Sequence, residues 1–319
     1  MVSVLMITYK HENFIAQAIE GVLEQKANFP FELIICEDAS PDGTSKIIQK
    51  YKDQYPDKII YVRNEVNIGM MQNFINGLKL SKSPYVAICD GDDYWCDESK
   101  LQKQVDFLIA NAGFALCFHS VYELNEKGEL SRNGKNTEID EYTYSIDDLA
   151  SGNIIHTPSV VFRNGLIKNF PAWYKDSPVG DYVLHMFNAK HGLIKYLPLS
   201  MAVYRVHNDG VWSGLMRTSV LDRWISMLNN LIKEHFDPSV KEKLFLQKRK
   251  YIVEYLRLLM QENDWQLFLD KLAIFSTADD YISQLWLIEY YPKYIQGIKK
   301  SRTYKLASSL QKIYKKFHK

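Results

Sequence analysis

Short apolar runs alternate with amphipathic segments along the first hundred residues of the chain. Apolar runs rich in β-branched residues are typical of buried strands, and apolar residues spaced three and four positions apart are typical of helices. The apolar runs predict strands at 2–8, 31–36, 59–62 and 85–89. The amphipathic segments between them predict helices at 14–23, 44–55 and 71–80. Because strands that alternate with helices form parallel sheets with right-handed crossovers, the pattern predicts an α/β fold. We expect a mostly parallel central sheet flanked by helices.

The pattern is less regular after residue 99. Residues 125–142 are polar and contain glycine, which indicates a surface excursion. The other expected elements are a helix from 99 to about 111, a strand at 114–124, a strand at 157–162, a helix at 182–191 and a strand at 194–206.

The pattern of apolar and polar residues changes again near residue 220. From there apolar residues recur at helical spacing, with almost no glycine or proline before Pro292. The sequence therefore predicts two domains, one at residues 1–215 and a helical region at residues 216–319.

Composition narrows the function classes. The chain has 319 residues, 46% of them apolar, and a net charge of +1, so we expect a globular protein with no nucleic-acid partner. No basic segment followed by a long apolar stretch is visible, and no apolar run approaches about 18 residues, so we expect neither a signal peptide nor a membrane span. Cys36, Cys89 and Cys117 stand in apolar runs, which is typical of reduced core cysteines in a cytoplasmic protein.

The most informative segment is the end of the expected strand at 85–89. Three carboxylates, Asp90, Asp92 and Asp93, follow it directly around the single residue Gly91. Like charges this close repel one another and resist dehydration, and a divalent cation would relieve both costs. Glycine leaves room for the close approach of a ligand. The alternative is a solvated acidic turn.

Two other polar segments follow expected strands. They are Thr8-Tyr9-Lys10 and Glu37-Asp38. Ligands of parallel α/β sheets bind beyond the carboxyl ends of the strands. We therefore expect these two segments and the acidic segment to converge in one crevice.

Taken together, the motifs of the chain resemble those of the family 2 glycosyltransferases, which bind nucleotide sugars with the Rossmann-like GT-A fold. The resemblance covers about residues 1–215 and rests on the order and spacing of its motifs. The matching segments are Val4-Leu5-Met6-Ile7-Thr8-Tyr9, Glu37-Asp38-Ala39-Ser40-Pro41-Asp42-Gly43-Thr44, Asn67-Ile68-Gly69, Asp90-Gly91-Asp92-Asp93, Gly180-Asp181-Tyr182 and Tyr204-Arg205-Val206-His207.

The resemblance implies a nucleotide-sugar site. Thr8 and Tyr9 would line the nucleobase pocket, and Asp38 would accept a hydrogen bond from the base, typically uracil. The residues implied to bind the nucleotide sugar are Thr8, Tyr9, Asp38, Asn67, Gly69, Asp90, Gly91 and Asp92.

The resemblance also implies a metal site and a catalytic base. Asp92 and Asp90 would hold Mn²⁺ or Mg²⁺, and His207 is a candidate third ligand or diphosphate contact. Such an ion would stabilise the charge that develops on the departing diphosphate. Asp181 would take the proton from the acceptor hydroxyl. Direct attack opposite the leaving group would invert the anomeric configuration.

Several of these residues also have purely structural interpretations. Asp181 precedes a helical pattern and could be its N-cap, and His207 could be a loop histidine bonded to backbone. Trp95 and Trp212 are candidates to stack on sugar faces, with packing as the alternative. The extra carboxylate Asp209 stands where glycine is frequent in the family.

The resemblance implies an inverting, metal-dependent transferase that moves a sugar from a UDP-sugar to a saccharide or lipid-linked saccharide. Cell-surface polysaccharide synthesis of the O-antigen or capsule type is the expected setting. A non-catalytic homologue that binds a nucleotide or saccharide is one alternative. A nucleotidyltransferase is another, but it needs a glycine-rich phosphate loop after the first strand, and residues 8–12 contain no glycine. A phosphatase with a nucleophilic aspartate is disfavoured because its motif usually lies near the N-terminus, followed by threonine or valine.

Residues 299–319 carry eight basic side chains and no acidic one. Apolar residues recur among them at helical spacing. A basic amphipathic helix is typical of elements that lie on a membrane surface, so peripheral contact with the inner face of the plasma membrane is one expectation. A solvated terminal helix packed on the helical region is the alternative.

Overall fold

The computed structural model describes residues 1–132, 142–208, 210, 215–262, 264–276 and 296. The chain forms two compact units. The first comprises Met1–Met216 together with Ser226–Gln247, and the second comprises Arg217–Ile225 together with the described residues from Lys248 onward. The basic segment 299–319, Asp209 and Trp212 lie outside the described residues. No described helix is long and apolar enough to cross a membrane.

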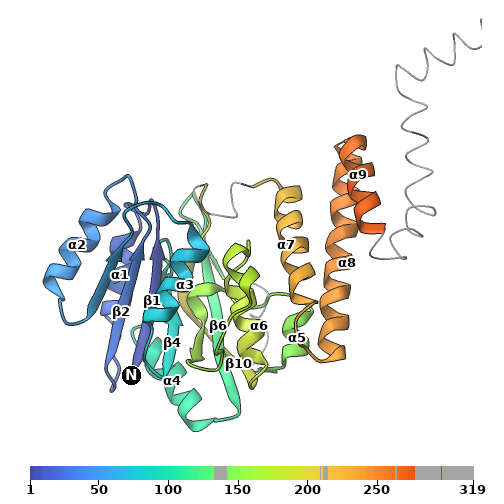
Figure 1. The fold of residues 1–319 in the computed structure, drawn as a ribbon. Coiled ribbons are helices and arrows are strands. Elements are labelled where there is room, and N and C mark those ends of the chain that lie inside the picture. The colour runs from blue at the N-terminus through green and yellow to red at the C-terminus, as the bar shows by residue number, and fades with distance from the viewer. Residues whose placement is uncertain (133–141, 209, 211–214, 263, 277–295, 297–319) are drawn as a thin grey trace, which may run out of the picture. The chain divides into compact units, whose positions relative to one another are not determined.

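One mixed sheet of ten strands runs through the first unit (Figure 1). Its main path is β3-β2-β1-β4-β9-β6-β10-β5, while β7 pairs with β6 and β8 pairs with β10. The strands are β1 (Val2–Thr8), β2 (Phe31–Glu37), β3 (Ile59–Arg63), β4 (Tyr85–Ile88), β5 (Tyr94–Trp95), β6 (Phe114–Leu124), β7 (Leu130–Arg132), β8 (Tyr142–Tyr144), β9 (Val161–Arg163) and β10 (Leu193–Arg205).

The direction of the strands confirms the expected α/β sheet. Strands β3, β2, β1 and β4 run parallel to their neighbours, and so do β6 and β10. Strand β9 lies between these two groups and is antiparallel to both β4 and β6. The short strands β5, β7 and β8 also pair antiparallel. The carboxyl ends of β1, β2 and β4 therefore share one edge of the sheet, as expected.

Five helices of the first unit follow the predicted amphipathic segments, whereas the short helix at Ile146–Ala150 was not predicted. The helices of this unit are α1 (Ile15–Leu23), α2 (Thr44–Gln54), α3 (Met70–Leu80), α4 (Lys100–Ala110), α5 (Ile146–Ala150) and α6 (Asp181–Ala189), with 3₁₀ turns η1 (Thr157–Ser159) and η2 (Ala172–Asp176). Helices α7 (Arg217–Leu231) and α8 (Pro238–Gln261) contribute to both units, and α9 (Trp265–Ser276) belongs to the second.

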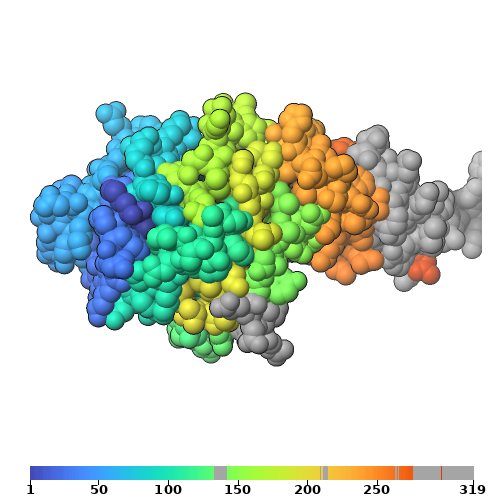
Figure 2. Space-filling model, turned by 90° about the horizontal axis from the view of Figure 1, so that it is seen from below, coloured from blue at the N-terminus to red at the C-terminus, as the bar shows by residue number. Residues whose placement is uncertain are grey.

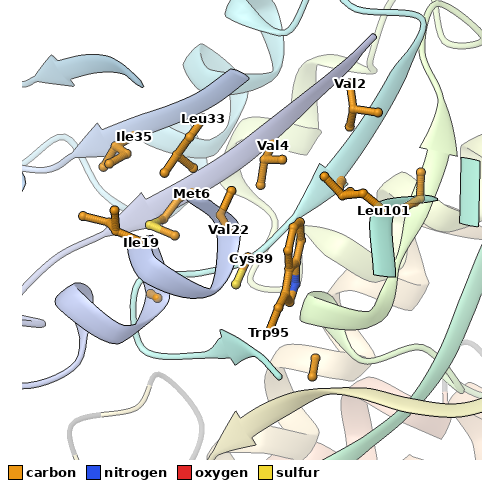
Figure 3. Packing of buried hydrophobic residues seen from close by; sticks show 14 of the residues in the cluster. Val2, Val4, Met6, Ile19, Val22, Leu33, Ile35, Cys89, Trp95 and Leu101 are labelled. Atoms are coloured by element: carbon orange, nitrogen blue, oxygen red, sulfur yellow. The ribbon is translucent and has the colours of Figure 1, made fainter. Parts of the chain in front are cut away.

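The main core lies on one face of β1. Because side chains alternate across a strand, Val2, Val4 and Met6 point to the same face, and all three are fully buried. Figure 3 shows them beside Val22 of α1 and Trp95. Helices α1, α2 and α4 supply the apolar residues that cover this face.

Helix α3 covers the other face of β1. A Cβ atom at Gly77 would stand only 2.2 Å from Cδ1 of Leu5, so α3 packs closely on the odd-numbered side. In the space-filling view the dark-blue start of the chain lies among blue and teal segments (Figure 2). The sheet is therefore covered by helices on both faces.

The prediction of a strand at 157–162 is wrong in its first half. Thr157–Ser159 form a 3₁₀ turn, and the strand runs at Val161–Arg163 instead. Pro158 explains the difference, because proline has no N–H for a sheet ladder and favours the first positions of a helical turn.

The second unit has its own small core. Leu221 and Ile225 of α7 pack with residues of α8 and α9, and the fully buried residues Leu256 and Phe268 belong to this cluster. The helical structure expected after residue 220 is therefore confirmed for the described part of α7, α8 and α9.

Candidate active site

The turns after β1 and β2 are held against each other. The backbone N–H of Lys10 donates to Ser40 Oγ at 3.0 Å, and that of His11 donates to Thr44 Oγ1 at 2.9 Å. Lys10 and Ala39 have φ angles of 60° and 56°, a left-handed conformation that is uncommon for residues with a side chain. These contacts set the path by which the chain leaves the sheet edge.

Asp38 organises the loop that precedes α3. Its Oδ1 accepts hydrogen bonds from Asn64 Nδ2 at 2.8 Å and from the N–H of Ile68 at 2.9 Å, and its Oδ2 accepts from the N–H of Gly69 at 2.9 Å. Asn67 Nδ2 donates to the Asp38 carbonyl at 3.2 Å. The structure therefore brings Asp38, Asn67 and Gly69 together, as three of the expected nucleotide-binding residues.

The other two residues expected at the base pocket follow β1. Tyr9 is 37% exposed, and Lys10 Nζ lies 5.2 Å from its ring centre. Thr8 is buried, and its Oγ1 lies 3.1 Å from Nδ1 of His11. The backbone N–H of Asp38 donates to the Thr8 carbonyl at 3.1 Å, which joins this segment to the Asp38 loop.

Gly91 allows the acidic motif to pass close to β1. Its N–H donates to the carbonyl of Ile7 at 3.0 Å. A Cβ atom at this position would stand 2.6 Å from Thr8 Oγ1 and 3.0 Å from His11 Nδ1. Only glycine fits without displacing these neighbours, so the sequence-based interpretation of Gly91 as a close-approach residue agrees with the geometry.

Asp93 and Arg205 tie the acidic motif to β10. The backbone N–H of Arg205 donates to Asp93 Oδ1 at 2.9 Å, and its guanidinium donates to the carbonyl of Asp92. The guanidinium carbon lies 4.6 Å from the ring centre of Tyr94 and 5.1 Å from that of Phe14. Burial, followed by the nearby Asp92 charge, raises the pKa of Asp93. Asp93 therefore has a structural role in holding the motif.

Asp92 faces two histidines. Its Oδ2 lies 3.3 Å from Nε2 of His207 and 3.7 Å from Nε2 of His11. Burial alone would raise the pKa of Asp92, but the hydrogen bond with His207 and the proximity of both histidines hold it below its usual value. The interpretation of His207 as a mere loop histidine is therefore insufficient, since its ring reaches the acidic motif.

Asp90 presents an unusual oxygen. Its Oδ1 is buried and has no hydrogen-bond partner among the described residues. Burial raises the pKa of Asp90 well above its usual value, and the charges of Asp92 and Asp181 add to this effect. Asp181 therefore stands within electrostatic reach of Asp90, although the two lie far apart in the sequence. A solvated acidic turn would leave no such oxygen, so that alternative fails for Asp90.

Asp181 is the first residue of α6. Its Oδ2 accepts a hydrogen bond from Thr157 Oγ1 at 2.9 Å, and its Oδ1 accepts one from the N–H of Tyr182 at 2.7 Å. The helix has no side-chain cap, so Asp181 does not act as the N-cap that the sequence allowed. Its negative charge at the helix N-terminus is nevertheless favourable for the helix dipole.

Trp95 lies outside this group. It is 3% exposed, its Nε1 donates to the carbonyl of Pro158 at 2.9 Å, and Lys100 Nζ lies 4.1 Å from its ring centre. The packing alternative therefore holds for Trp95, and no sugar face can stack on it.

Three residues near the acids were missed by sequence reasoning. Arg205 stands inside a quoted motif, so its position was available as a signal. His11 comes three residues after the end of β1, at the edge where ligands are expected, and its residue type was a further signal. Thr157 gave no signal, because its contact with Asp181 depends on the path of a distant turn.

Comparison with known proteins shows which proteins the chain resembles as a whole. The uncharacterized protein Rv1520 of Mycobacterium tuberculosis is 38% identical over 218 residues, which are 66% of this chain, and the chain spans about 60% of the length of that relative. The Escherichia coli UDP-Glc:alpha-D-GlcNAc-diphosphoundecaprenol beta-1,3-glucosyltransferase WfaP is 34% identical over 212 residues, covering 66% of this chain and 79% of WfaP.

A solved structure shares the fold. The mannosyltransferase PcManGT from Pyrobaculum calidifontis, in complex with GDP-Man and Mn²⁺, superposes with a TM-score of 0.58 at 17% identity and covers 97% of this chain and 83% of its own. The expected GT-A fold is confirmed. Residues 3–169, more than half of the chain, match the family model described as Glycosyl transferase family 2. The chain is therefore a member of glycosyltransferase family 2.

Proposed function

We propose that the protein transfers a sugar from a UDP-sugar to an acceptor hydroxyl, with inversion at the anomeric carbon. The observation that carries the proposal is the buried Asp90 Oδ1, which has no described hydrogen-bond partner and feels the charges of both Asp92 and Asp181. We infer that two elements distant in sequence bring their carboxylates to one substrate. Such an arrangement suits a cation and a catalytic base that face the same substrate.

The residue types at this edge suit a divalent metal ion, although no group of three or more His, Cys, Asp or Glu side chains among the described residues is already arranged to hold one. Asp90, Asp92 and His207 would hold it, since the Asp90 Oδ1 lacks a described partner and His207 Nε2 stands 3.3 Å from Asp92 Oδ2. Two carboxylates suit Mg²⁺ or Mn²⁺, and an imidazole nitrogen favours Mn²⁺. When bound, the ion would stabilise negative charge on a departing diphosphate. The Mn²⁺ in the PcManGT complex supports this choice.

The Asp38 loop is the proposed nucleoside pocket. Asp38, Asn67 and Gly69 are fixed to one another, and Thr8 and Tyr9 leave the sheet beside them. The partly exposed Tyr9 ring is available for a base to stack on. UDP is proposed because the name of WfaP, a relative that this chain matches over 212 residues, specifies UDP-Glc as the donor.

Asp181 is the proposed general base. The hydroxyl of Thr157 and the N–H of Tyr182 hold one hydrogen bond on each carboxylate oxygen, so the side chain has a fixed orientation with lone pairs left to accept a proton. Asp181 would take the proton from the acceptor oxygen as that oxygen attacks the anomeric carbon. The bond to the diphosphate breaks on the opposite face, and no covalent enzyme intermediate forms.

The proposed acceptor is a saccharide carried on a lipid diphosphate, in cell-surface polysaccharide synthesis. Its support is the name of WfaP, which specifies such an acceptor. The basic residues of the segment 299–319 would suit an anionic membrane surface. Co-sedimentation with anionic liposomes, with and without this segment, tests that contact, and equal pelleting of both forms would contradict it.

The function is tested by combining binding and turnover. UDP with Mn²⁺ should raise the melting temperature of the wild type, and Asp92→Ala should abolish that shift. Asp181→Ala should keep the shift but lower turnover about 10²–10⁴-fold with the best sugar from a panel of nucleotide sugars. Asp57→Ala, at an exposed position, is the control.

Three outcomes would count against the proposal. Wild-type stabilisation in Asp92→Ala would contradict the metal site. Wild-type turnover in Asp181→Ala would contradict the assignment of the base. Binding of UDP without turnover of any sugar in the panel would favour the non-catalytic alternative.

A further inference from the structure

His11 lies between the first strand and the acidic motif. Its Nδ1 is 3.1 Å from Thr8 Oγ1, and its Nε2 is 3.7 Å from Asp92 Oδ2. Only 14% of its side chain is exposed. The ring therefore bridges the end of β1 and the carboxylate that is proposed to hold the metal.

The two contacts of His11 select one arrangement of its proton. A neutral imidazole has one N–H donor and one acceptor nitrogen. If Nε2 were the acceptor, its lone pair would face the negative Asp92 oxygen, which is unfavourable. The favoured arrangement has the Thr8 hydroxyl donating to Nδ1, which leaves the hydrogen on Nε2, the nitrogen that lies 3.7 Å from Asp92 Oδ2.

The backbone around His11 is built to hold the ring in place. The residue before it, Lys10, has the unusual φ of 60°, and the N–H of His11 is fixed by Thr44 Oγ1 at 2.9 Å. The carbonyl of His11 accepts the N–H groups of Phe14 and Ile15 at 2.9 and 2.8 Å, where α1 begins. The absence of a side chain at Gly91 leaves the space that Thr8 and the ring occupy.

His207 approaches the same oxygen from another direction. The rings of His11 and His207 are nearly perpendicular, at 84°, with their centres 6.4 Å apart. Asp92 Oδ2 is therefore flanked by a histidine from the β1 exit and by one that follows β10. Two flanking groups restrict the rotation of the carboxylate more than one does.

We propose that His11, supported by Thr8, is a positioning residue that orients the Asp92 carboxylate for metal and diphosphate binding. This inference rests on the proposed function, and it gives Thr8 a role besides lining the base pocket. Groups that orient a metal ligand typically change metal affinity about 10–100-fold when they are removed.

The test is Mn²⁺ titration in the presence of UDP, with free Mn²⁺ measured by electron paramagnetic resonance. His11→Ala should weaken Mn²⁺ binding about 10–100-fold. His11→Asn should weaken it equally, because its short amide can replace only Nδ1. His11→Gln should stay close to the wild type, because its longer amide can place an N–H near the position of Nε2. Thr8→Val should weaken binding to a smaller extent.

Control variants separate the possible failures. His191→Ala, at an exposed position in the turn after α6, should bind Mn²⁺ like the wild type. Wild-type affinity in His11→Ala together with weak binding in Asp92→Ala would overturn this inference alone. Wild-type affinity in Asp92→Ala would overturn the proposed metal site and this inference with it. Equal losses in the Gln and Asn variants of His11 would overturn the assignment of Nε2 as the positioning donor.

Discussion

His185 lies fully inside the first unit, and neither of its ring nitrogens has a hydrogen-bond partner among the described residues. It stands one helical turn after Asp181, within α6. Burial lowers the pKa of His185 from 6.5 to about 4, although the Asp181 charge opposes the shift. The neutral imidazole is therefore accommodated in the folded state, whereas the unfolded state accepts a proton more readily.

The sign of this shift predicts acid sensitivity. Because the folded pKa lies below the unfolded one, the contribution of His185 is complete above about pH 6.5 and is lost as the pH falls toward 4. Each pKa unit corresponds to roughly 1.4 kcal/mol, so the loss is on the order of 3 kcal/mol. Urea unfolding at pH 7 and pH 4.5 should show that His185→Leu loses less stability between these pH values than the wild type. An equal loss in both proteins would contradict the prediction, and His191→Leu is a matched exposed control.

At the scale of elements, the exit of β2 and the start of α3 depend on one side chain. Asp38 accepts the N–H groups of Ile68 and Gly69 immediately before α3 begins. Gly69 has a φ of 87°, which a residue with a side chain adopts only with strain. A single carboxylate thus replaces the cap that the helix itself lacks, since no side chain caps its N-terminus.

Removing this carboxylate should loosen the loop without disturbing the distant core. Asp38→Ala leaves the Ile68 N–H without its acceptor, while the Gly69 N–H keeps Asn67 Oδ1 at 3.1 Å and Asn64 Nδ2 keeps Asn73 Oδ1 at 3.0 Å. We therefore expect a loss of about 1–3 kcal/mol in the free energy of unfolding. Hydrogen exchange should increase at residues 64–72 and stay unchanged in α4. Uniform protection in both regions, or a loss as small as that of the exposed control Asp57→Ala, would contradict the prediction.

Elements with local sequence signals could be predicted, whereas contacts between distant turns could not. Strands β1, β2 and β4 and the segments after them could be predicted, because apolar runs and turn residues are local signals and parallel strands end at one edge. The contacts of Asp92 with His11 and of Asp93 with Arg205 could not, since they depend on how distant turns pack. The 3₁₀ turn at Thr157 was missed because the apolar pattern of residues 157–162 outweighed the signal of Pro158.

At the scale of the whole molecule, the first unit includes a helical segment that follows the sheet in the sequence. Residues 226–247 belong to it, and among them Leu228, Leu231 and Leu244 are fully buried. Glu234 accepts a hydrogen bond from Trp173 Nε1 at 2.7 Å, and Gln247 accepts one from the Tyr182 hydroxyl at 3.1 Å. The helical segment thus contributes directly to the environment of α6.

Shortened chains would reveal this dependence. Burying one leucine contributes about 1.5–3 kcal/mol, so the loss of three is comparable with the total stability of a typical protein. A chain that ends at residue 216 should melt at a much lower temperature than one that ends at residue 261, as followed by circular dichroism. Equal melting temperatures would show that the sheet region is stable without residues 226–247.

The antiparallel direction of β9 has a consequence for the reach of the site. Because β9 runs against β4, the residues that precede it arrive at the edge where β4 ends, and Thr157 meets Asp181 there. Three residue pairs with β4, from Ala87 with Val161 to Tyr85 with Arg163, and two with β6 determine this alignment. A slip by one pair would displace Thr157 by about 3.3 Å and invert the faces of the strand. The separation between the proposed base Asp181 and the acidic motif after β4 therefore depends on the register of one of the shortest strands in the sheet.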